Sequence, residues 1–252
     1  MNNPYETDEL LNQYMAFHFG GSYFGVPNYP AHCAELCIDF MGKRRRRKAL
    51  DLGCAVGRST FDLAKGFDAV VGIDLSSRFI DAANRLKAGE TLPYFLHDEG
   101  ELGRTVEVSL SSLEFEGVKS KVQFEVGDAC NLGSAHVGYD LIFAGNLIDR
   151  VNNPAAFLSD LQHRVVPGGL LVISSPYTLL EEYTPKANWI GGHMENGESR
   201  TVLQGMQTVL APHFKMVKTP MDVPFVIRET SRKFQHSIAE MSVWERSATL
   251  EG

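Results

Sequence analysis

The stretch Ala49-Leu-Asp-Leu-Gly-Cys-Ala-Val-Gly-Arg58 decides the fold, because a short apolar strand there runs into a glycine turn and then into a helix. One helix later, Val70-Val-Gly-Ile-Asp74 supplies a second strand that ends in a carboxylate. Gly53 and Gly57 let the backbone approach a ligand where a Cβ would clash, and Asp74 can accept hydrogen bonds from both hydroxyls of a ribose. The pattern therefore predicts a βαβ unit that binds the nucleoside end of a small cofactor.

The residues of the glycine turn indicate the class of cofactor. A dinucleotide-binding turn has the pattern G-x-G-x-x-G, which places a pyrophosphate at the helix N-terminus. Here Ala55 occupies the middle glycine position and Arg58 the last one. The turn therefore suits a ligand without pyrophosphate, and the missing glycines disfavour the alternative of a nicotinamide dehydrogenase.

Three elements in this order resemble the motifs of class I S-adenosylmethionine-dependent methyltransferases: Asp51-x-Gly53-Cys-x-x-Gly57, then Asp74, then Gly127-Asp128-Ala129. The resemblance implies that the glycine turn holds the methionine part of the cofactor S-adenosylmethionine and that S-adenosylhomocysteine is the product. It also implies that the acid after the second strand holds the ribose and that the acid after the third meets the adenine amino group. The cofactor-binding residues that we expect are Asp51, Gly53, Gly57, Asp74, Leu75, Asp128, Ala129 and Asn146, with Tyr14 and His18 from an N-terminal helix.

The length and composition indicate one α/β domain over residues 1–252. With 44% hydrophobic residues, the chain can bury one substantial core. We expect a Rossmann-like fold with a mostly parallel seven-stranded sheet, helices on both faces, an N-terminal helical lid and an inserted hairpin. Its parts are N-terminal helices (1–47), a cofactor-binding core (48–175), and a substrate loop followed by C-terminal strands (176–252).

The apolar periodicity locates the individual elements. Alternation within residues 92–116 predicts the inserted hairpin, at an edge of the sheet. Because ligands of open α/β sheets bind outside the carboxyl ends of the strands, the loops after the strands should form the site. We expect helices at 6–17, 31–40, 60–65, 78–87, 154–165 and 201–210, and strands at 48–52, 69–73, 122–126, 139–144, 169–174, 214–219 and 237–245.

Charge and cysteine content exclude several classes of partner. The run Lys43-Arg-Arg-Arg-Arg-Lys48 admits a nucleic-acid interpretation, but the net charge of −7 and the lack of interleaved aromatic residues favour a solvated helix end. Four cysteines without a C-x-x-C pair indicate buried reduced thiols and no metal site. No apolar run approaches the ~18 residues of a membrane span, and no signal peptide is evident, so we expect a cytoplasmic protein without membrane or nucleic-acid partners.

Two further stretches are similar to the thiohistidine N-methyltransferases of ovothiol biosynthesis. They are the loop Ser175-Pro-Tyr-Thr-Leu-Leu-Glu-Glu-Tyr-Thr-Pro-Lys-Ala-Asn-Trp-Ile-Gly-Gly192 and the tail Asp222-Val-Pro-Phe-Val-Ile-Arg-Glu-Thr-Ser-Arg-Lys-Phe-Gln-His236 with Val243-Trp244. Tyr5-Glu-Thr, Phe17-His-Phe-Gly20 and Cys33-Ala-Glu-Leu-Cys37 belong to the same resemblance, which covers nearly the whole chain. It implies N-methylation of the imidazole ring of 5-thiohistidine (4-mercaptohistidine), at the nitrogen nearest the side chain, to give ovothiol A.

An amino-acid substrate of this kind needs partners for both charged ends. Arg228 or Lys233 could bind its carboxylate, and Glu181, Glu182 or Asp149 its ammonium group. The alternative for each of these side chains is a surface role.

The imidazole ring needs a wall that orients it and excludes water. Tyr177, Tyr183 and Trp189 could form that wall, with a packing role as the alternative. We expect Tyr177, Glu181 and Glu182 to act in catalysis, with one glutamate orienting the amino group or receiving a ring proton. Two other functions stay open: the same fold acting on another small metabolite, and a non-catalytic S-adenosylmethionine-binding regulator.

Overall fold

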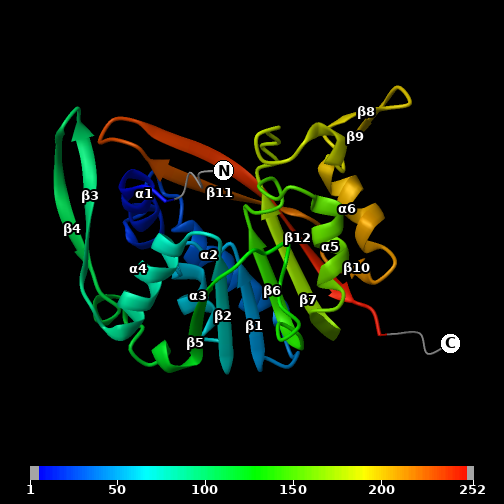
Figure 1. Ribbon diagram of the computed structural model, residues 1–252, viewed down its shortest axis with the longest axis horizontal. Coiled ribbons are helices and arrows are strands. Elements are labelled where there is room, and N and C mark those ends of the chain that lie inside the picture. Colours follow the sequence, from blue (N-terminus) through cyan, green and yellow to red (C-terminus); the bar gives the residue numbers. More distant parts are fainter. Residues whose placement is uncertain (1–5, 249–252) are drawn as a thin grey trace.

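The computed structural model describes residues 6–248 and shows a mixed eight-stranded sheet covered by helices on both faces (Figure 1). Tyr5, part of one expected motif, lies outside this range. The helices are α1 (Asp8–Phe19), α2 (Tyr29–Met41), α3 (Arg58–Leu63), α4 (Ser77–Ala88), α5 (Pro154–Leu161) and α6 (Val202–Leu210), with short 3-10 turns at Ser111–Leu113, Lys119–Lys121 and Lys186–Asn188.

The order of the strands confirms the expected Rossmann-like α/β fold. Five central strands are parallel, and β12 runs antiparallel to β7 and to its other neighbours. In spatial order the strands are β10 (Phe214–Met216), β12 (Phe234–Arg246), β7 (Val165–Ser175), β6 (Tyr139–Gly145), β1 (Lys48–Leu52), β2 (Ala69–Asp74) and β5 (Val122–Val126), with β11 (Met221–Arg228) also paired to β12.

Strand side chains alternate between two hydrophobic cores, as expected for a sheet covered on both faces. Ala49 of β1 packs in the core shared with α2, α3 and α4, whereas its neighbour Leu50 packs in the core shared with α5 and α6. The parallel strands therefore end in one row of loops between the two helical layers.

The expectation of seven strands was wrong, because the tail contains β11 as an additional strand that pairs with β12. β12 is thirteen residues long, and only Glu240–Glu245 pairs with β7. Its first half extends past the sheet and pairs with β11, so the two strands form a long ribbon (Figure 1).

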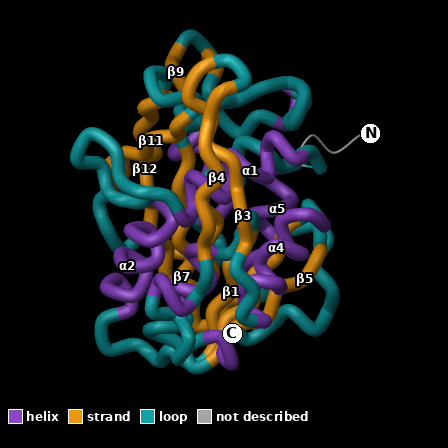
Figure 2. The backbone as a smooth tube through the Cα atoms, turned by 90° about the vertical axis from the view of Figure 1, so that its left-hand side faces the viewer, coloured by secondary structure: helices purple, strands orange, loops and turns teal. Residues whose placement is uncertain are grey.

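The hairpin expected within residues 92–116 is present, but it does not extend the main sheet. β3 (Leu92–Glu99) and β4 (Leu102–Val108) form a separate two-stranded sheet that stands beside α1 (Figure 2). Leu92, Tyr94 and Leu96 are buried on one face of β3, so this face packs on the helical core rather than pairing with an edge strand.

Two expectations between residues 154 and 200 also needed correction. The helix beginning at Pro154 ends at Leu161, because Val165 already pairs with Tyr139 as the first residue of β7. β7 therefore begins four residues before the expected start at 169 and includes Gly168 and Gly169, at a register shift. The loop up to Arg200 contains a small hairpin of β8 (His193–Glu195) and β9 (Glu198–Arg200).

Cys33, Cys37 and Cys54 are buried free thiols as expected, whereas Cys130 is exposed. Within residues 6–248, no cluster of His, Cys, Asp and Glu has the geometry of a metal site. None of the helices in this range has the length and apolar character needed to cross a membrane.

Candidate functional site

Backbone strain marks the ends of three central strands. Ala55 follows β1, Asn146 follows β6 and Tyr177 follows β7, and their φ angles are 46°, 51° and 53°. Residues other than glycine rarely adopt this left-handed backbone conformation. It costs about 1–3 kcal/mol and is found mainly where surrounding structure and function require it. These three residues therefore locate the candidate site at the carboxyl edge of the sheet.

The glycine turn is held by buried contacts. Asp51 is 1% exposed, and its Oδ2 accepts hydrogen bonds from the hydroxyls of Ser59 and Thr60, both at 2.6 Å. Burial raises the pKa of Asp51 to about 6, although the two hydroxyls oppose this rise. Asp51 thus connects β1 to the first turn of α3, and its contacts are with the turn itself.

Gly53 and Gly57 serve different purposes in this turn. Gly53 has a φ of 71°, and a Cβ there would lie 3.2 Å from the Leu147 side chain, which follows β6. Gly57 has a φ of 90°, and its Cβ would lie 2.6 Å from the ring of Phe124. Gly53 therefore keeps the edge of the site open, whereas Gly57 is required by packing inside the domain.

Asp74 ends β2 with both carboxylate oxygens directed by backbone donors. Oδ2 accepts a hydrogen bond from the N–H of Ala55 and Oδ1 from that of Ser76, both at 2.9 Å. Burial raises the pKa of Asp74, and these backbone N–H groups oppose the rise. Because each carboxylate oxygen can accept a second hydrogen bond, Asp74 retains the capacity to bind a pair of vicinal hydroxyls.

Two exposed apolar side chains lie beside Asp74. Leu75 is 60% exposed and Val126, at the end of β5, is 56% exposed. Asp128 is exposed nearby, with Oδ1 held by the N–H of Cys130 at 2.8 Å, and Ala129 is half-buried. This combination of exposed apolar surface and a fixed carboxylate suits the flat face and amino edge of a nucleobase.

Helix α1 and the residues just before it contact both α4 and the end of the glycine turn. Before its first turn, Glu6 accepts a hydrogen bond from the N–H of Ser77 at 2.7 Å, at the start of α4. At its other end, the carbonyl of His18 accepts a hydrogen bond from Arg58 at 3.3 Å, just after the glycine turn. Tyr14 packs on Phe79 of α4 with ring centroids 4.8 Å apart.

His18 carries an unsatisfied polar atom in this helix. The side chain is 5% exposed, and Nδ1 has no hydrogen-bond partner in the described part of the chain. Burial, together with the charge of Arg58, lowers the pKa of His18 to about 3, so the ring is neutral at physiological pH. Buried polar atoms normally have partners, and a ligand at the glycine turn could supply one here.

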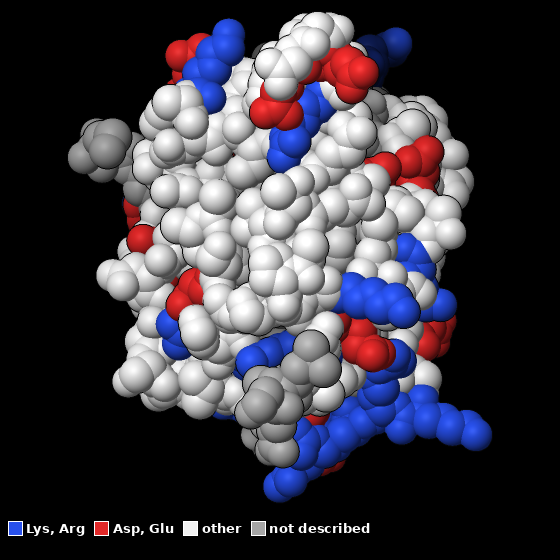
Figure 3. Space-filling view, turned by 90° about the vertical axis from the view of Figure 1, so that its right-hand side faces the viewer, with Lys and Arg blue, Asp and Glu red and all other residues white. Residues whose placement is uncertain are grey.

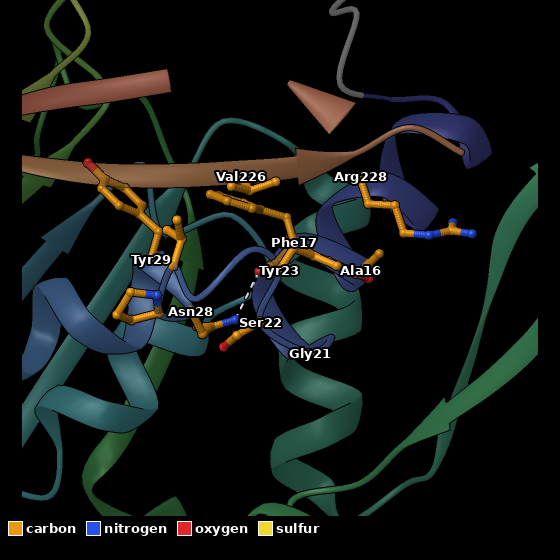
Figure 4. Close-up of a pocket in the computed structure, with 11 residues that line it drawn as sticks. Ala16, Phe17, Gly21, Ser22, Tyr23, Asn28, Tyr29, Val226 and Arg228 are labelled. Atoms are coloured by element: carbon orange, nitrogen blue, oxygen red, sulfur yellow. Dashed lines mark hydrogen bonds between the residues drawn. The ribbon is translucent and has the colours of Figure 1, made fainter. Parts of the chain in front are cut away.

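A second polar cluster lies at the ends of β6 and β7. The hydroxyl of Tyr29, from α2, donates to Asn146 Oδ1 at 2.8 Å and lies 2.7 Å from Ser174 Oγ. Figure 4 shows Tyr29 at one end of a small cavity between the end of α1 and β11, with Phe17 and Val226 beside it. That cavity has a volume of about 10 Å³, which is room for one water molecule rather than a substrate.

Asp149 is the buried charge of this cluster. It is 1% exposed, Oδ2 accepts hydrogen bonds from the N–H of Thr178 and from Arg150, both at 3.1 Å, and Oδ1 has no partner among the described residues. Burial raises the pKa of Asp149, whereas the charge of Arg150 and the nearby hydroxyl of Ser175 oppose this rise. A buried carboxylate with one free oxygen is suited to bind a positively charged nitrogen or an N–H group.

Tyr177 is oriented from two sides. Its N–H donates to Ser175 Oγ at 2.9 Å, and its hydroxyl donates at 2.7 Å to Oε1 of Glu240, a residue of β12. Burial and then the neighbouring Glu240 raise the pKa of Tyr177, which therefore stays protonated. Sequence reasoning missed Glu240 and Tyr29, because one is a single acid in a strand and the other resembles an ordinary residue at a helix start.

The three residues expected to form the aromatic wall each contact a different partner in the structure. Tyr183 lies under the guanidinium of Arg150, which is 4.8 Å from its ring centroid, and Trp189 donates to the carbonyl of Thr184 at 2.9 Å. No ring contact joins Tyr177, Tyr183 and Trp189 there. The catalytic candidates Glu181 and Glu182 are exposed.

Arg228 and Lys233, the two residues expected to bind a carboxylate, each pair with an acidic residue in the structure. Arg228 has a side chain 5% exposed and pairs with Asp98 of the β3–β4 hairpin at 2.5 Å. Lys233 is 71% exposed and pairs with Glu229 at 2.5 Å. The β11–β12 ribbon carries both residues to its tip, so Arg228 connects two hairpins and Lys233 lies on the surface.

Comparison with known proteins agrees with this geometry. Residues 50–171 match a family model described as a methyltransferase domain. The chain is similar to ajmaline N-methyltransferase of Rauvolfia serpentina (23% identity; 53% of this chain, 37% of that protein) and to phosphoethanolamine N-methyltransferase of Triticum aestivum (26%; 64% and 28%). It therefore spans well under half the length of these relatives.

A solved structure shares the fold over nearly the whole length of both chains. It is magnesium protoporphyrin IX methyltransferase from Synechocystis PCC 6803 with bound S-adenosylhomocysteine, at 14% identity and a TM-score of 0.59, covering 96% of this chain and 97% of that one.

Proposed function

We propose that this chain, whose residues 50–171 match the model of a methyltransferase domain, is an enzyme that transfers the methyl group of S-adenosylmethionine to a nitrogen atom of a small molecule. The names of the curated relatives support methyl transfer to nitrogen. The buried carboxylate of Asp149 at the same edge of the sheet supports an amine or N-heterocycle as substrate.

The described residues fit S-adenosylmethionine in three places. Asp74 would bind the ribose hydroxyls, while Leu75, Asp128 and Ala129 would contact the adenine. His18 Nδ1, which is buried and without a protein partner, would bind the methionine part beside Gly53. When bound, this cofactor supplies an activated methyl group on a sulfonium. Asp51 and Gly57 would act indirectly, by shaping the turn.

The finer proposal is that the acceptor is 5-thiohistidine and the product ovothiol A. The observation that carries it is Asp149, whose free Oδ1 would bind the ammonium group of an amino acid. Arg150 takes over the role first expected of Arg228: a single nitrogen, Nη1, makes its bonds to Asp149 and Thr178, so its other N–H groups are available for a carboxylate.

Catalysis would consist mainly of positioning and water exclusion. Tyr177, oriented by Glu240, would set the plane of the imidazole ring beside the strand ends. The ring nitrogen forms the new N–CH₃ bond as the bond between carbon and sulfonium breaks, and the methylated ring then releases a proton. Asp149 and Glu240, which lie at the same strand ends, are the carboxylates proposed to accept this proton.

The test is incubation of the chain with S-adenosylmethionine and 5-thiohistidine, histidine or another small amine, with mass spectrometry of the products. We expect a mono-methylated 5-thiohistidine, and a large loss of activity in Asp149→Asn with S-adenosylhomocysteine affinity unchanged. Methylation of a different metabolite alone would overturn the substrate, and cofactor binding without any turnover would indicate a non-catalytic regulator.

A further inference from the structure

The run of basic residues from Lys43 to Lys48 lies at the opposite edge of the sheet from the methyl-transfer site. It connects the end of α2 to the start of β1, where the parallel strands begin. Figure 3 shows Lys and Arg side chains gathered along the lower edge of the molecule, while the face above is mostly uncharged. Arg44 donates to the carbonyl of Phe40 at 3.3 Å, so part of the run does complete the helix end, as expected.

Arg45 has a fixed orientation and unused donors. Its Nε donates to Oδ1 of Asp140 at 2.6 Å, and the Asp140 side chain is only 3% exposed. Oδ2 of Asp140 also accepts the backbone N–H groups of Arg47 at 2.8 Å and Lys48 at 3.1 Å. Because only Nε of Arg45 is engaged, its two terminal nitrogens have no protein partner within residues 6–248. A buried carboxylate thus holds the guanidinium in place with its outer edge free.

Arg44, the neighbour of Arg45, has an exchangeable partner. It pairs with Glu245, and the two side chains are 36% and 35% exposed. Exposed ion pairs of this kind contribute about 0.2–1 kcal/mol, so a second anion can compete with Glu245 for the guanidinium.

A cavity of about 350 Å³ lies against these two arginines. Met41, Asp140 and the bare backbone of Gly168 and Gly169 also line it. Its volume is in the range of small-molecule sites, and the guanidinium group of arginine binds phosphate or carboxylate oxygens in a geometry that lysine cannot match. We propose that this cavity binds a small metabolite through a phosphate or carboxylate group held by Arg45 and Arg44. This site is independent of the proposed methyl transfer.

The test is titration calorimetry of the full chain with pyrophosphate and, separately, citrate, which distinguishes phosphate from carboxylate ligands. Arg45→Gln should weaken binding at least about tenfold, because charge-assisted hydrogen bonds are lost. Glu245→Gln should strengthen it about two- to fivefold by removing the competing carboxylate. Arg104→Gln is the matched control, because it removes the same charge from a side chain 63% exposed on β4 and should leave the affinity unchanged.

Three results would overturn the proposal. The first is that neither anion binds at concentrations up to about 10 mM, which is above the Kd of even a weak specific site. The second is equal weakening by Arg45→Gln and Arg104→Gln, which would indicate a diffuse charge effect. The third is a Glu245→Gln variant that binds no more tightly than the wild type; this variant adds no unpaired buried group, so it tests the site even if Arg45→Gln folds poorly.

Discussion

Asp51 is a carboxyl group whose charged form is disfavoured by burial. Its pKa is raised from 3.8 to about 6, so the folded state binds its proton more tightly than the unfolded state does. The contribution of Asp51 to the free energy of unfolding is therefore most favourable below pH 3.8 and is lost as the pH rises to about 6. At 1.36 kcal/mol per pKa unit this loss is on the order of 3 kcal/mol.

We expect Asp51→Asn to remove this part of the pH dependence. Urea unfolding at several pH values between about 4 and 7 should show the free energy of unfolding of the wild type falling relative to that of the variant as the pH rises. A constant difference between the two proteins would mean that Asp51 titrates in the fold as it does in the unfolded chain.

Tyr177 is the residue that we expect to control which atom is methylated. Sulfur is the softer nucleophile of 5-thiohistidine, so an N-methyl product requires the ring nitrogen to be held in line with the methyl group. Positioning is worth up to ~7–11 kcal/mol, enough to reverse an intrinsic preference. Tyr177→Ala should therefore lower the rate and raise the share of S-methylated product, as resolved by proton NMR.

Tyr177→Phe is the matched control, because it keeps the ring and loses only the hydrogen bond to Glu240. Its product ratio should lie between those of the wild type and Tyr177→Ala. If both variants were slow but still gave only N-methyl product, Tyr177 would have no role in regiochemistry.

At the scale of elements, we propose that the loop after β6 binds the substrate carboxylate through Arg150. Arg228, at the tip of the β11–β12 ribbon, pairs with Asp98 instead. Arg150→Met should raise the KM for 5-thiohistidine about 10- to 100-fold, because a charge-assisted pair with its carboxylate is lost. The same variant should treat decarboxylated thiohistidine like the wild type. Arg228→Met should preserve the preference for the carboxylated substrate; losing it would return the carboxylate site to the ribbon.

The ion pair between Arg228 and Asp98 should contribute to the free energy of unfolding and not to substrate binding. Asp98→Ala leaves the buried guanidinium of Arg228 without its carboxylate partner, whose side chain is 32% exposed. We expect a loss of about 2 kcal/mol in the free energy of unfolding, below the 3–5 kcal/mol of fully buried pairs. In urea unfolding, the double variant Asp98→Ala, Arg228→Met should be more stable than Asp98→Ala alone. If the two were equally unstable, the ion pair would not be the source of the lost stability.

At the scale of the whole molecule, cofactor binding should stabilise the entire fold, because α1, α4 and the glycine turn meet around one site. At 100 times its Kd, a ligand adds about 2.7 kcal/mol, which corresponds to a rise in Tm of about 5–10 °C for a chain of this size. Differential scanning fluorimetry with S-adenosylhomocysteine tests this.

Asp74→Ala is the variant that identifies the site in this experiment. Removing the two charge-assisted hydrogen bonds expected to the ribose should weaken binding roughly 30- to 1000-fold and abolish most of the Tm shift at the same ligand concentration. An undiminished shift in this variant would place the ligand elsewhere.

The sequence by itself determined the βαβ core and predicted where a nucleoside would bind. Apolar runs, the glycine turn and the carboxylates of Asp74 and Asp128 are local signals, because each depends on residues a few positions apart. Most central strands and helices were therefore predicted to within a few residues. β1 and β5 were predicted with their observed ends.

Only the tertiary structure decided the contacts around the ends of β6 and β7. Tyr29 reaches Asn146 across 117 residues, and Tyr177 reaches Glu240 across 63, so no local pattern predicts either contact. Arg228 illustrates the same limit: its charge suggested a substrate partner, but β11 pairs with β12 and places it against Asp98, 130 residues away. A side chain's type follows from the sequence, whereas its partner depends on which strands pair and in which register.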